Sequence, residues 1–591
     1  MKRLRVQSII IRCVMIVLLS VRAWGVSEEN TTLPLFVHGV KQLDIAHLYD
    51  ALDVDRAPAW MFWRDHTPKI KRAVANKAES ILRPFLDSEG FYDATYRMVV
   101  GERNATLYIT EGEPVRIQSI VTDTDYNLSN VVTFHRGDIF RAEDFIQIKS
   151  DIVDTMLKEG YCSYDLDTKA YVDLDKHRVD VRYKLRKGKP CRFGKATVKG
   201  LQSIDPRIVL SRVRAKEGRR FSKELLQATS SAVYNLKAFD GVAIDANRKI
   251  YNTVPVDIRV QEITKPYHIE LGAGYDTYVG PRVHATLHKY NFLGDAKQLR
   301  LRLAWSKLEK IAIVEYDQPM LFTWQNYAID YGFRGGYSDL EFDGFRESKY
   351  FITNFLRYEG YRFDLTAGLS AESIDISRLS EGDNLLPEYA YDTFFLVYPY
   401  LKAIYDRRDS KLDPKEGYYL KAYLEYGLPT TSDASRYLKW EAEARYIHTW
   451  RGFTGAIVGK IGTVRIFQDS AGGIPESKKF FSGGAYSNRA YGFRELGVLV
   501  SPTQDLVNGA QSMANLTLEV DHRIRGKLSG AVFCDNTILN ADSHDFSTPV
   551  LTSVGVGVRY QTPVGPFKLD VGFNVHDPSQ YGIIFQIGQS F

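Results

Sequence analysis

The sequence predicts three tandem α+β modules followed by a membrane-spanning antiparallel β-barrel, most simply of sixteen strands. Two observations predict this fold class. In the first half, Pro114, Pro190 and Pro266 recur at equal intervals of 76 residues. In the second half, apolar residues alternate with polar or small residues along many segments, which is the two-residue period of a β-strand with one apolar face. The 591 residues are also too many for one ordinary domain.

The first 25 residues have the pattern of an export signal. Three basic residues precede an apolar run over 9–19, and the small residues Ala23 and Gly25 suit a cleavage site. The run is too short to span a bilayer, which needs about 20 apolar residues, and no later segment is long enough. We therefore expect a signal peptide over residues 1–25 and an exported protein without a membrane helix.

Composition argues against several classes of function. The 77 basic and 72 acidic residues nearly balance, so nothing suggests a nucleic-acid partner. No nucleophile elbow, phosphate loop or dinucleotide fingerprint stands out. His284 and His288 are four residues apart, but no third ligand is evident, so a surface or lumen pair is favoured over a metal site. We expect neither an enzyme nor a bound metal or cofactor.

Three cysteines follow the expected signal peptide: Cys162, Cys191 and Cys534. A Cys162–Cys191 bridge is conceivable in an oxidising compartment. Isolated buried thiols are the preferred interpretation, because free cysteine behaves as a small apolar side chain.

The first half divides into modules over residues 34–112, 113–188 and 189–265. Each contains an amphipathic helix and a closing strand, which suggests a small sheet with an exposed edge. The helix faces are Val74, Ala78, Ile81 and Phe85; then Phe145, Ile148, Ile152 and Met156; then Leu225, Ala228, Ala232 and Leu236. Such an edge can accept an extended chain by β-augmentation. Binding is favoured over the alternative that the modules are spacers only.

The second half, residues 267–591, has the alternation of a membrane barrel. Apolar Leu438, Trp440 and Tyr446 share one strand face, and four charged residues over 439–445 occupy the other. Four charges cannot line a packed core unless each is paired, but they can line a water-filled lumen. The alternative is a large soluble β protein. At about 20 residues per strand and connection, the length allows sixteen strands.

Several motifs in this half occur in the order found in one family. They are Tyr405-Asp406-Arg407-Arg408-Asp409 with Asp413-Pro414-Lys415-Glu416-Gly417, the hairpin over 557–566, the terminal segment over 585–591, and Phe480-Phe481-Ser482-Gly483-Gly484 followed by Arg489-Ala490-Tyr491. With them, the chain resembles the BamA/TamA superfamily of outer-membrane assembly factors. That resemblance implies that the modules are periplasmic POTRA domains. Their number, three, is most similar to TamA.

The resemblance implies roles for named residues. Asp406, Arg407, Asp409, Pro414 and Gly417 match a barrel motif, which is physically a strand end and a turn set by the proline and the glycine.

The segment Arg489-Ala490-Tyr491 matches the tip of the sixth extracellular loop, which folds into the lumen. Its arginine is expected to contact Asp535, in the wall segment that begins at Phe533, because a carboxylate offers two-pronged bonding. Ala490 stands where the family has Gly. If that backbone needs a positive φ, the tip is shaped differently.

A closed barrel requires the first strand, near 268–275, to pair with the last, near 583–591. Gly272 and Gly274 weaken the first strand, so we expect a lateral seam between it and the strand that carries Phe585, Gly588 and Phe591. An opened seam would expose an edge that templates strands of an incoming protein.

The leading hypothesis is a factor that inserts outer-membrane or autotransporter proteins into the bacterial outer membrane, with its POTRA domains in the periplasm. Its partners would be the lipid bilayer, unfolded clients and, by resemblance to TamA, an inner-membrane-anchored TamB-like protein. A two-partner-secretion translocator is a second hypothesis, although those relatives carry two POTRA domains and a plug helix. A passive outer-membrane pore is a third.

Overall fold

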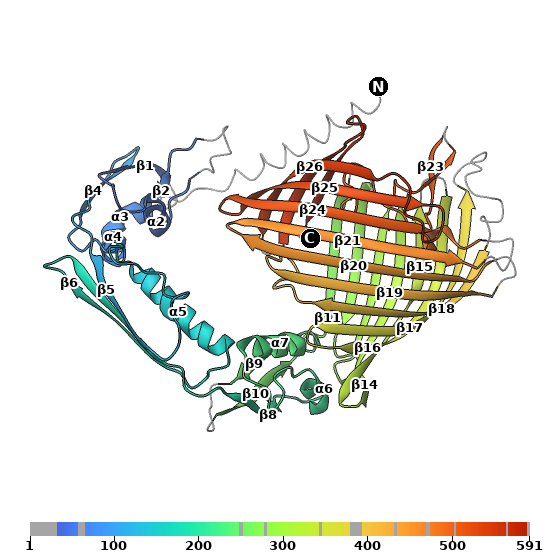
Figure 1. Cartoon of the computed structure of the whole chain (residues 1–591), viewed down its shortest axis with the longest axis horizontal. Coiled ribbons are helices and arrows are strands. Elements are labelled where there is room, and N and C mark those ends of the chain that lie inside the picture. Colours follow the sequence, from blue (N-terminus) through green and yellow to red (C-terminus); the bar gives the residue numbers. More distant parts are fainter. Residues whose placement is uncertain are drawn as a thin grey trace. The chain divides into compact units, whose positions relative to one another are not determined.

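The computed structural model describes residues 32–56, 65–246, 252–276, 280–341, 345–378, 393–430, 434–467, 473–501, 504–562 and 565–587. The expected signal peptide, residues 1–25, lies outside this part of the chain. The chain divides into two compact units: residues 1–192 with short pieces near 220–223 and 251–253, and the remainder up to 591. The first unit holds modules 1 and 2, and the second holds most of module 3 together with the barrel sheet (Figure 1).

Modules 1 and 2 are small mixed sheets covered by helices. Module 1 orders its strands β2-β1-β4-β3, and module 2 orders them β5-β7-β6. In both, the first strand pairs in parallel with the closing strand, β1 with β4 and β5 with β7. The elements are β1 (Thr32–His38), α2 (Ile45–Ala51), β2 (Lys69–Lys71), α3 (Arg72–Asn76), α4 (Ala78–Ser88), β3 (Thr95–Val100), β4 (Ala105–Thr110), β5 (Arg116–Thr124), α5 (Ala142–Lys158), β6 (Asp165–Asp173) and β7 (Arg178–Arg186).

The expected helix face packs in module 2, whereas in modules 1 and 3 the buried positions differ in part from the expected ones. Ile148, Ile152 and Met156 of α5 are buried against the module 2 sheet. In module 1 the expected single helix is two helices, α3 and α4, which meet at Lys77. Ala78, Leu82 and Leu86 carry the buried face of α4.

Cys162 and Cys191 form a disulfide with a Cα–Cα distance of 5.8 Å, so the preferred interpretation of isolated thiols is wrong. The backbone brings them together, because the Cys191 N–H donates to the Gly160 carbonyl at 2.9 Å. Spacing in the sequence could not show this contact, since the two residues are 29 apart. Cys534 is a free thiol.

Module 3 has strand order β8-β10-β9, with α6 and α7 beside it. Its elements are β8 (Arg192–Lys199), α6 (Pro206–Ser211), α7 (Lys223–Tyr234), β9 (Phe239–Asp245) and β10 (Thr253–Glu262). Arg212, which ends α6, donates to Asp330 on the barrel strand β15 at 2.6 Å, and both side chains are buried. Arg214 lies 3.9 Å from Glu359 at the end of β16. Burial lowers the pKa of the Arg214 guanidinium, and the carboxylate of Glu359 opposes that shift.

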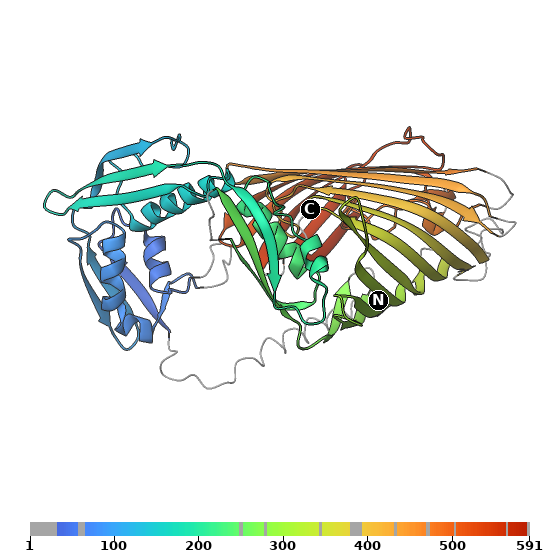
Figure 2. The ribbon, with the colours of Figure 1, turned by 90° about the horizontal axis from the view of Figure 1, so that it is seen from below.

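Sixteen antiparallel strands form the C-terminal sheet in the order β11 to β21, then β24 to β28 (Figures 1 and 2). They are β11 (Tyr267–Asp276), β12 (Gly280–Lys289), β13 (Gln298–Ser306), β14 (Glu309–Trp324), β15 (Tyr327–Glu341), β16 (Phe345–Glu359), β17 (Phe363–Arg378), β18 (Thr393–Asp406), β19 (Gly417–Pro429), β20 (Tyr437–Trp450), β21 (Phe453–Ile466), β24 (Ser512–Arg525), β25 (Leu528–Asn540), β26 (Leu551–Thr562), β27 (Gly565–Asn574) and β28 (Tyr581–Ile587).

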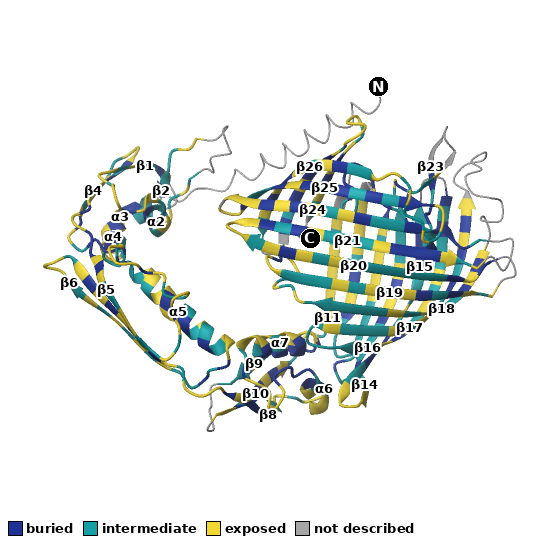
Figure 3. Cartoon of the chain, in the orientation of Figure 1, coloured by how far each residue is buried: buried dark blue, intermediate teal, exposed yellow. Residues whose placement is uncertain are grey.

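The faces of this sheet follow the two-residue period. On β26, Val554, Val556 and Val558 are exposed, while Ser553 and Arg559 on the other face are buried (Figure 3). The charged face of β20 also lies inward, paired as Lys439–Glu441 at 3.3 Å and Arg445–Glu443 at 2.5 Å. An apolar outer face over an ion-paired inner face is the arrangement of a membrane barrel wall. Within the described residues, no helix is long and apolar enough to cross a bilayer.

The sheet has two edge strands, β11 and β28. Over the described residues no pairing joins them, so the expected closure of first strand on last is not observed. β28 pairs with β27 over seven residues and leaves its other edge unpaired in that range. β11 likewise pairs on one side only, with β12.

Candidate functional site: a loop anchored inside the barrel

The longest strand connection, residues 467–511, joins β21 to β24 and contains η4 (Glu476–Lys478), β22 (Val498–Ser501) and β23 (Gln504–Asn508). β11 begins directly after module 3 and the strands alternate in direction, so this connection lies at the barrel end away from module 3. Its arms pair with each other, Phe480 with Ala510 and Ser482 with Leu496. The loop packs on the inner wall, where Phe480, Leu496 and Ala510 join a buried apolar cluster.

Arg489 lies at the centre of the site. Its Nε and Nη2 donate to the two oxygens of Asp535 on β25, each at 2.9 Å, and its backbone N–H donates to the same carboxylate at 3.1 Å. The guanidinium carbon stands 3.4 Å from the centre of the Phe533 ring. Arg489 is 3% exposed and Asp535 1%. A two-pronged, charge-assisted contact between enclosed groups fixes this part of the loop on the wall.

Further charged groups, absent from the sequence-based prediction, complete the cluster. Arg489 also donates to Glu519 on β24 at 2.5 Å and to Asp570 on β27 at 3.3 Å. Arg559 on β26 donates to the same two carboxylates, to Glu519 at 2.8 Å. Buried Lys568 of β27 and buried Asp521 of β24 lie among the same groups, so cations and carboxylates are interleaved, which offsets part of the cost of burying each charge. These charged groups lie at inward positions of four strands. The register of the strands, which the sequence does not reveal, places them at the same height along the barrel axis.

The backbone of Arg489 and Ala490 rests on two glycines that face each other across the last strand pair, Gly572 of β27 and Gly582 of β28. A Cβ at Gly582 would lie 2.4 Å from the Arg489 carbonyl oxygen, and one at Gly572 would lie 2.8 Å from the Arg489 carbonyl carbon. Ala490 is not among the residues with positive φ, so the residue type there is compatible with its backbone. The Tyr491 hydroxyl accepts from the Asn574 amide at 2.6 Å. The loop tip therefore reaches the last two strands of the sheet.

The barrel motif forms the connection between β18 and β19. Asp409 accepts from the backbone N–H groups of Lys415 and Glu416, at 2.9 and 3.2 Å. Gly417 has φ +116°, and a Cβ there would lie 2.2 Å from the Arg407 carbonyl oxygen.

The remaining motif residues are held locally as well. Asp406 accepts from Arg408 through both carboxylate oxygens. The Arg407 guanidinium lies 5.8 Å from the Tyr418 ring centre, and Pro414 is buried. The structure thus accounts for these residues as parts of one tightly held turn.

Comparison with known proteins identifies the family. The Omp85 superfamily domain matches residues 291–591, which is half of the chain. The chain belongs to the Omp85 superfamily.

Two curated relatives carry the name outer membrane protein assembly factor BamA. One, from Nitratidesulfovibrio vulgaris, is 22% identical over 94% of this chain and 72% of its own length. The other, from Neisseria meningitidis serogroup B, is 21% identical over 82% of this chain and 68% of its own length. Among solved structures, BamA from Haemophilus ducreyi lacking POTRA domains 1–3 matches with a TM-score of 0.51 at 16% identity, covering 80% of this chain and all of that one. At that identity, the structural likeness shows the fold.

Three of the expected seam residues of this Omp85 chain, Gly272, Gly274 and Phe585, lie on its edge strands. Gly272 makes room for a ring, because a Cβ there would lie 2.0 Å from His284 of β12. Gly274 pairs with Arg282 in a ten-residue register that has no shift, so β11 is a regular strand. Phe585 is exposed on β28. Gly588 and Phe591 lie outside the described residues.

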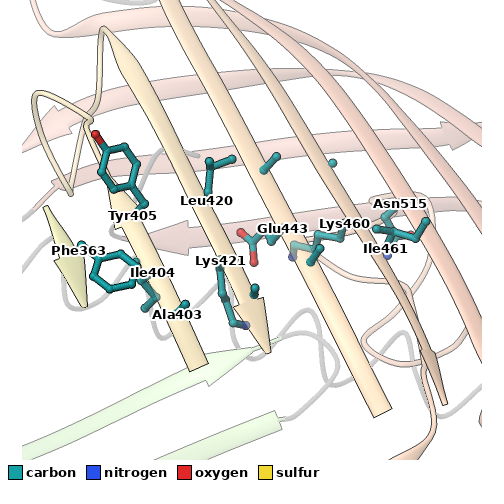
Figure 4. Close-up of a pocket in the computed structure, with 14 residues that line it drawn as sticks. Phe363, Ala403, Ile404, Tyr405, Leu420, Lys421, Glu443, Lys460, Ile461 and Asn515 are labelled. Atoms are coloured by element: carbon teal, nitrogen blue, oxygen red, sulfur yellow. The ribbon is translucent and has the colours of Figure 1, made fainter. Parts of the chain in front are cut away.

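The Omp85 wall is hollowed where small residues meet on its outer face. Ala403, Ala422 and Ala442 pair with one another across β18 to β20, and Gly459 of β21 pairs with Ala444. Larger residues, Phe363 and Tyr405 among them, also line the hollow (Figure 4).

Across the described residues, no three His, Cys, Asp or Glu side chains are grouped to hold a metal ion. His288, one of the expected histidine pair, accepts from Arg300 at 3.3 Å.

Proposed function

We propose that this protein inserts β-barrel clients, including autotransporters, into the bacterial outer membrane, with its three N-terminal modules in the periplasm. The observation that carries the proposal is the pair of edge strands, β11 and β28, in a sheet whose outer face is apolar. An unpaired edge at membrane depth is costly because lipid offers no hydrogen bonds to the backbone. Strands of an incoming client would supply the missing backbone hydrogen bonds to that edge. The BamA relatives, by their name, act in the same process.

The exposed surfaces of the two edge strands suit this role. Ile269 and Leu271 on β11 and Ile583 and Phe585 on β28 are all exposed. A client strand paired to either edge would continue an apolar outer face without a break. The driving force would be the client's own folding, through burial of apolar side chains in lipid and completion of its backbone bonds.

The N-terminal modules would deliver extended clients. Strand β6 of module 2 is an edge strand of nine residues, long enough for several backbone hydrogen bonds with an added strand. An inner-membrane-anchored, TamB-like partner is the further expectation for a three-module protein. Co-purification from cells with and without modules 1 and 2 tests for it.

The ion-paired loop favours insertion over a passive pore. The loop packs inside the barrel through buried charges and apolar side chains, which obstructs a wide permanent channel. The loop tip also contacts β28 directly, since Gln580, beside that strand, donates to the Ala490 carbonyl at 3.3 Å. Movement of the last strands would therefore be coupled to the loop.

A crosslink across the edges tests the proposal. In a Cys534→Ser background, cysteines replace Leu271 on β11 and Phe585 on β28, and neighbouring positions are screened until the pair oxidises. The control pair replaces Leu271 and Ala285, which already face each other between β11 and β12. Oxidation of the edge pair should stop client insertion into vesicles, and reduction should restore it, while the control pair has no effect. Normal insertion by the oxidised edge pair would overturn the proposed lateral route.

A further inference from the structure

A second buried cation of the same loop contacts a different part of the wall. Lys478, at the end of η4, is 7% exposed. Its Nζ lies 3.0 Å from Glu372 of β17 and 3.4 Å from Glu425 of β19. The ammonium also stands 3.8 Å from the centre of the Tyr398 ring. Lysine is among the residues least often buried, and it is buried here with two carboxylates as partners.

Tyrosine hydroxyls complete the enclosure of these carboxylates. Tyr398 donates to Glu372 at 2.6 Å. Tyr423 and Tyr437 both donate to Glu425, the former at 2.5 Å. Charged groups withdrawn from water need such additional hydrogen bonds to be held stably. The three tyrosines lie on β18, β19 and β20. The site that receives Lys478, which we call its receptor, therefore belongs to the wall and not to the loop.

The net charge of this receptor also fits a cation from the loop. Glu372, Glu425 and Glu347 of β16, which is 0% exposed, place three carboxylates in one enclosed region. Lys349 of β16 lies 3.8 Å from Glu372 and supplies a positive charge from the wall itself. Lys478 supplies another from the loop. Without the loop, Glu372 and Glu425 would each lose the ion pair with Lys478.

The two anchors are far apart in the sheet. Lys478 contacts the seventh and ninth strands, β17 and β19, whereas the Arg489 cluster lies on the twelfth to fifteenth, β24 to β27. The loop itself emerges between the eleventh strand and the twelfth. It therefore reaches back along the wall with Lys478 and forward with Arg489.

We propose that Lys478 is a second anchor, and that residues 478–489 form a strap held at both ends on different parts of the wall. Lys478 is a positioning residue: it holds the loop inside the barrel and ties the middle strands to the strands beside the β28 edge. Without Lys478, the η4 arm would be held on the wall by its apolar contacts and by the hydrogen bond that Ser482 donates to Asn515 of β24. The strap deepens the proposed function, because it would resist separation of the last strands, but its presence is testable without any client.

Single-channel recording of the full-length protein in planar bilayers tests the strap. The variant Lys478→Met with Glu372→Gln and Glu425→Gln removes all three charges, keeps side-chain volume, and leaves glutamine oxygens to accept from the tyrosines. The control is Lys307→Met, which removes an exposed cation in the β13–β14 connection, outside both anchors. Folding of each variant is checked by its heat-dependent mobility in detergent gels.

The neutral triple variant should raise the fraction of time that the channel is open by about tenfold, equivalent to about 1.4 kcal/mol of anchoring. Lys307→Met should leave that fraction at the wild-type level. Combination of the triple variant with Arg489→Ala should raise it further than either change alone. A folded triple variant with wild-type gating, or an equal effect from Lys307→Met, would overturn the second anchor. Because no client is present, either result leaves the lateral insertion route to be judged by its own crosslinking experiment.

Discussion

Replacement of Arg489 by alanine should strongly destabilise the folded barrel. The change removes one cation from a cluster of buried carboxylates. It leaves Asp535, which is 1% exposed, without its two-pronged partner. Removal of one member of a buried ion pair typically costs about 3–5 kcal/mol, because the other charge stays buried and unpaired. The loss of stability cannot exceed the free energy of undocking the loop, because water reaches the Asp535 carboxylate once the loop has undocked.

A second substitution separates charge imbalance from lost packing. Glu519 accepts from both Arg489 and Arg559. Arg489→Ala with Glu519→Gln removes one positive and one negative charge and so restores the net charge of the cluster, and we expect recovery of about 1–2 kcal/mol relative to the single variant. The control is Lys307→Ala, which alters an exposed cation in the β13–β14 connection and should change stability by less than about 0.5 kcal/mol.

Urea unfolding of the full chain in lipid vesicles, followed by tryptophan fluorescence, provides the measurement. The reasoning predicts a lower unfolding midpoint for Arg489→Ala and partial recovery in the double variant. An Arg489→Ala protein as stable as Lys307→Ala would refute the anchoring energy. Further destabilisation by Glu519→Gln would refute the argument from charge balance.

Three other changes have defined expectations. Gly582→Ala should displace the loop tip, because its Cβ would lie 2.4 Å from the Arg489 carbonyl oxygen, and proteolysis of the loop should become faster. The control Gly459→Ala, whose Cβ would have nothing within 4 Å, should leave the rate of proteolysis unchanged. Arg212→Met should remove the nearest cation from buried Asp330 on β15 and leave Arg357, at 3.7 Å, beside it, which lowers stability by about 1–3 kcal/mol in the same urea assay. Reduction of the Cys162–Cys191 disulfide should destabilise the first compact unit, which holds both cysteines, by about 3–4 kcal/mol. The change should be seen as faster proteolysis of that unit, and an unchanged rate would count against a structural role.

Local pattern predicted the strands well, because each barrel strand faces lipid on one side and the lumen on the other. The alternation in 438–446 and 553–560 therefore gave the correct faces before any contact was known. Features that this alternation does not encode were predicted wrongly. Nothing in the residues around Lys77 distinguishes one long helix from the two that meet there. The Cys162–Cys191 bond depends on a backbone contact made only in the folded module.

The charged partners of the loop show a second limit. The contact of Arg489 with Asp535 was accessible because a family resemblance supplied the pairing. In the sequence, Glu519, Asp570 and Lys478 look like any other charged residues of the lumen or the loops. Their positions along the barrel axis, and therefore their contacts, depend on the register of several strands. The sequence feature that could indicate these partners is weak. It is an acidic or basic residue at an inward position of one strand, with similar residues at inward positions of the neighbouring strands.

Client insertion by the purified full-length protein, reconstituted in vesicles of outer-membrane lipids, tests the central claim most directly. A urea-unfolded outer-membrane barrel is added, and its folded fraction is followed by its heat-dependent mobility on detergent gels. The account predicts that the client folds markedly faster than with empty vesicles, and that a crosslink between β11 and β28 removes the acceleration. A client that folds at the same rate with and without this protein would contradict it.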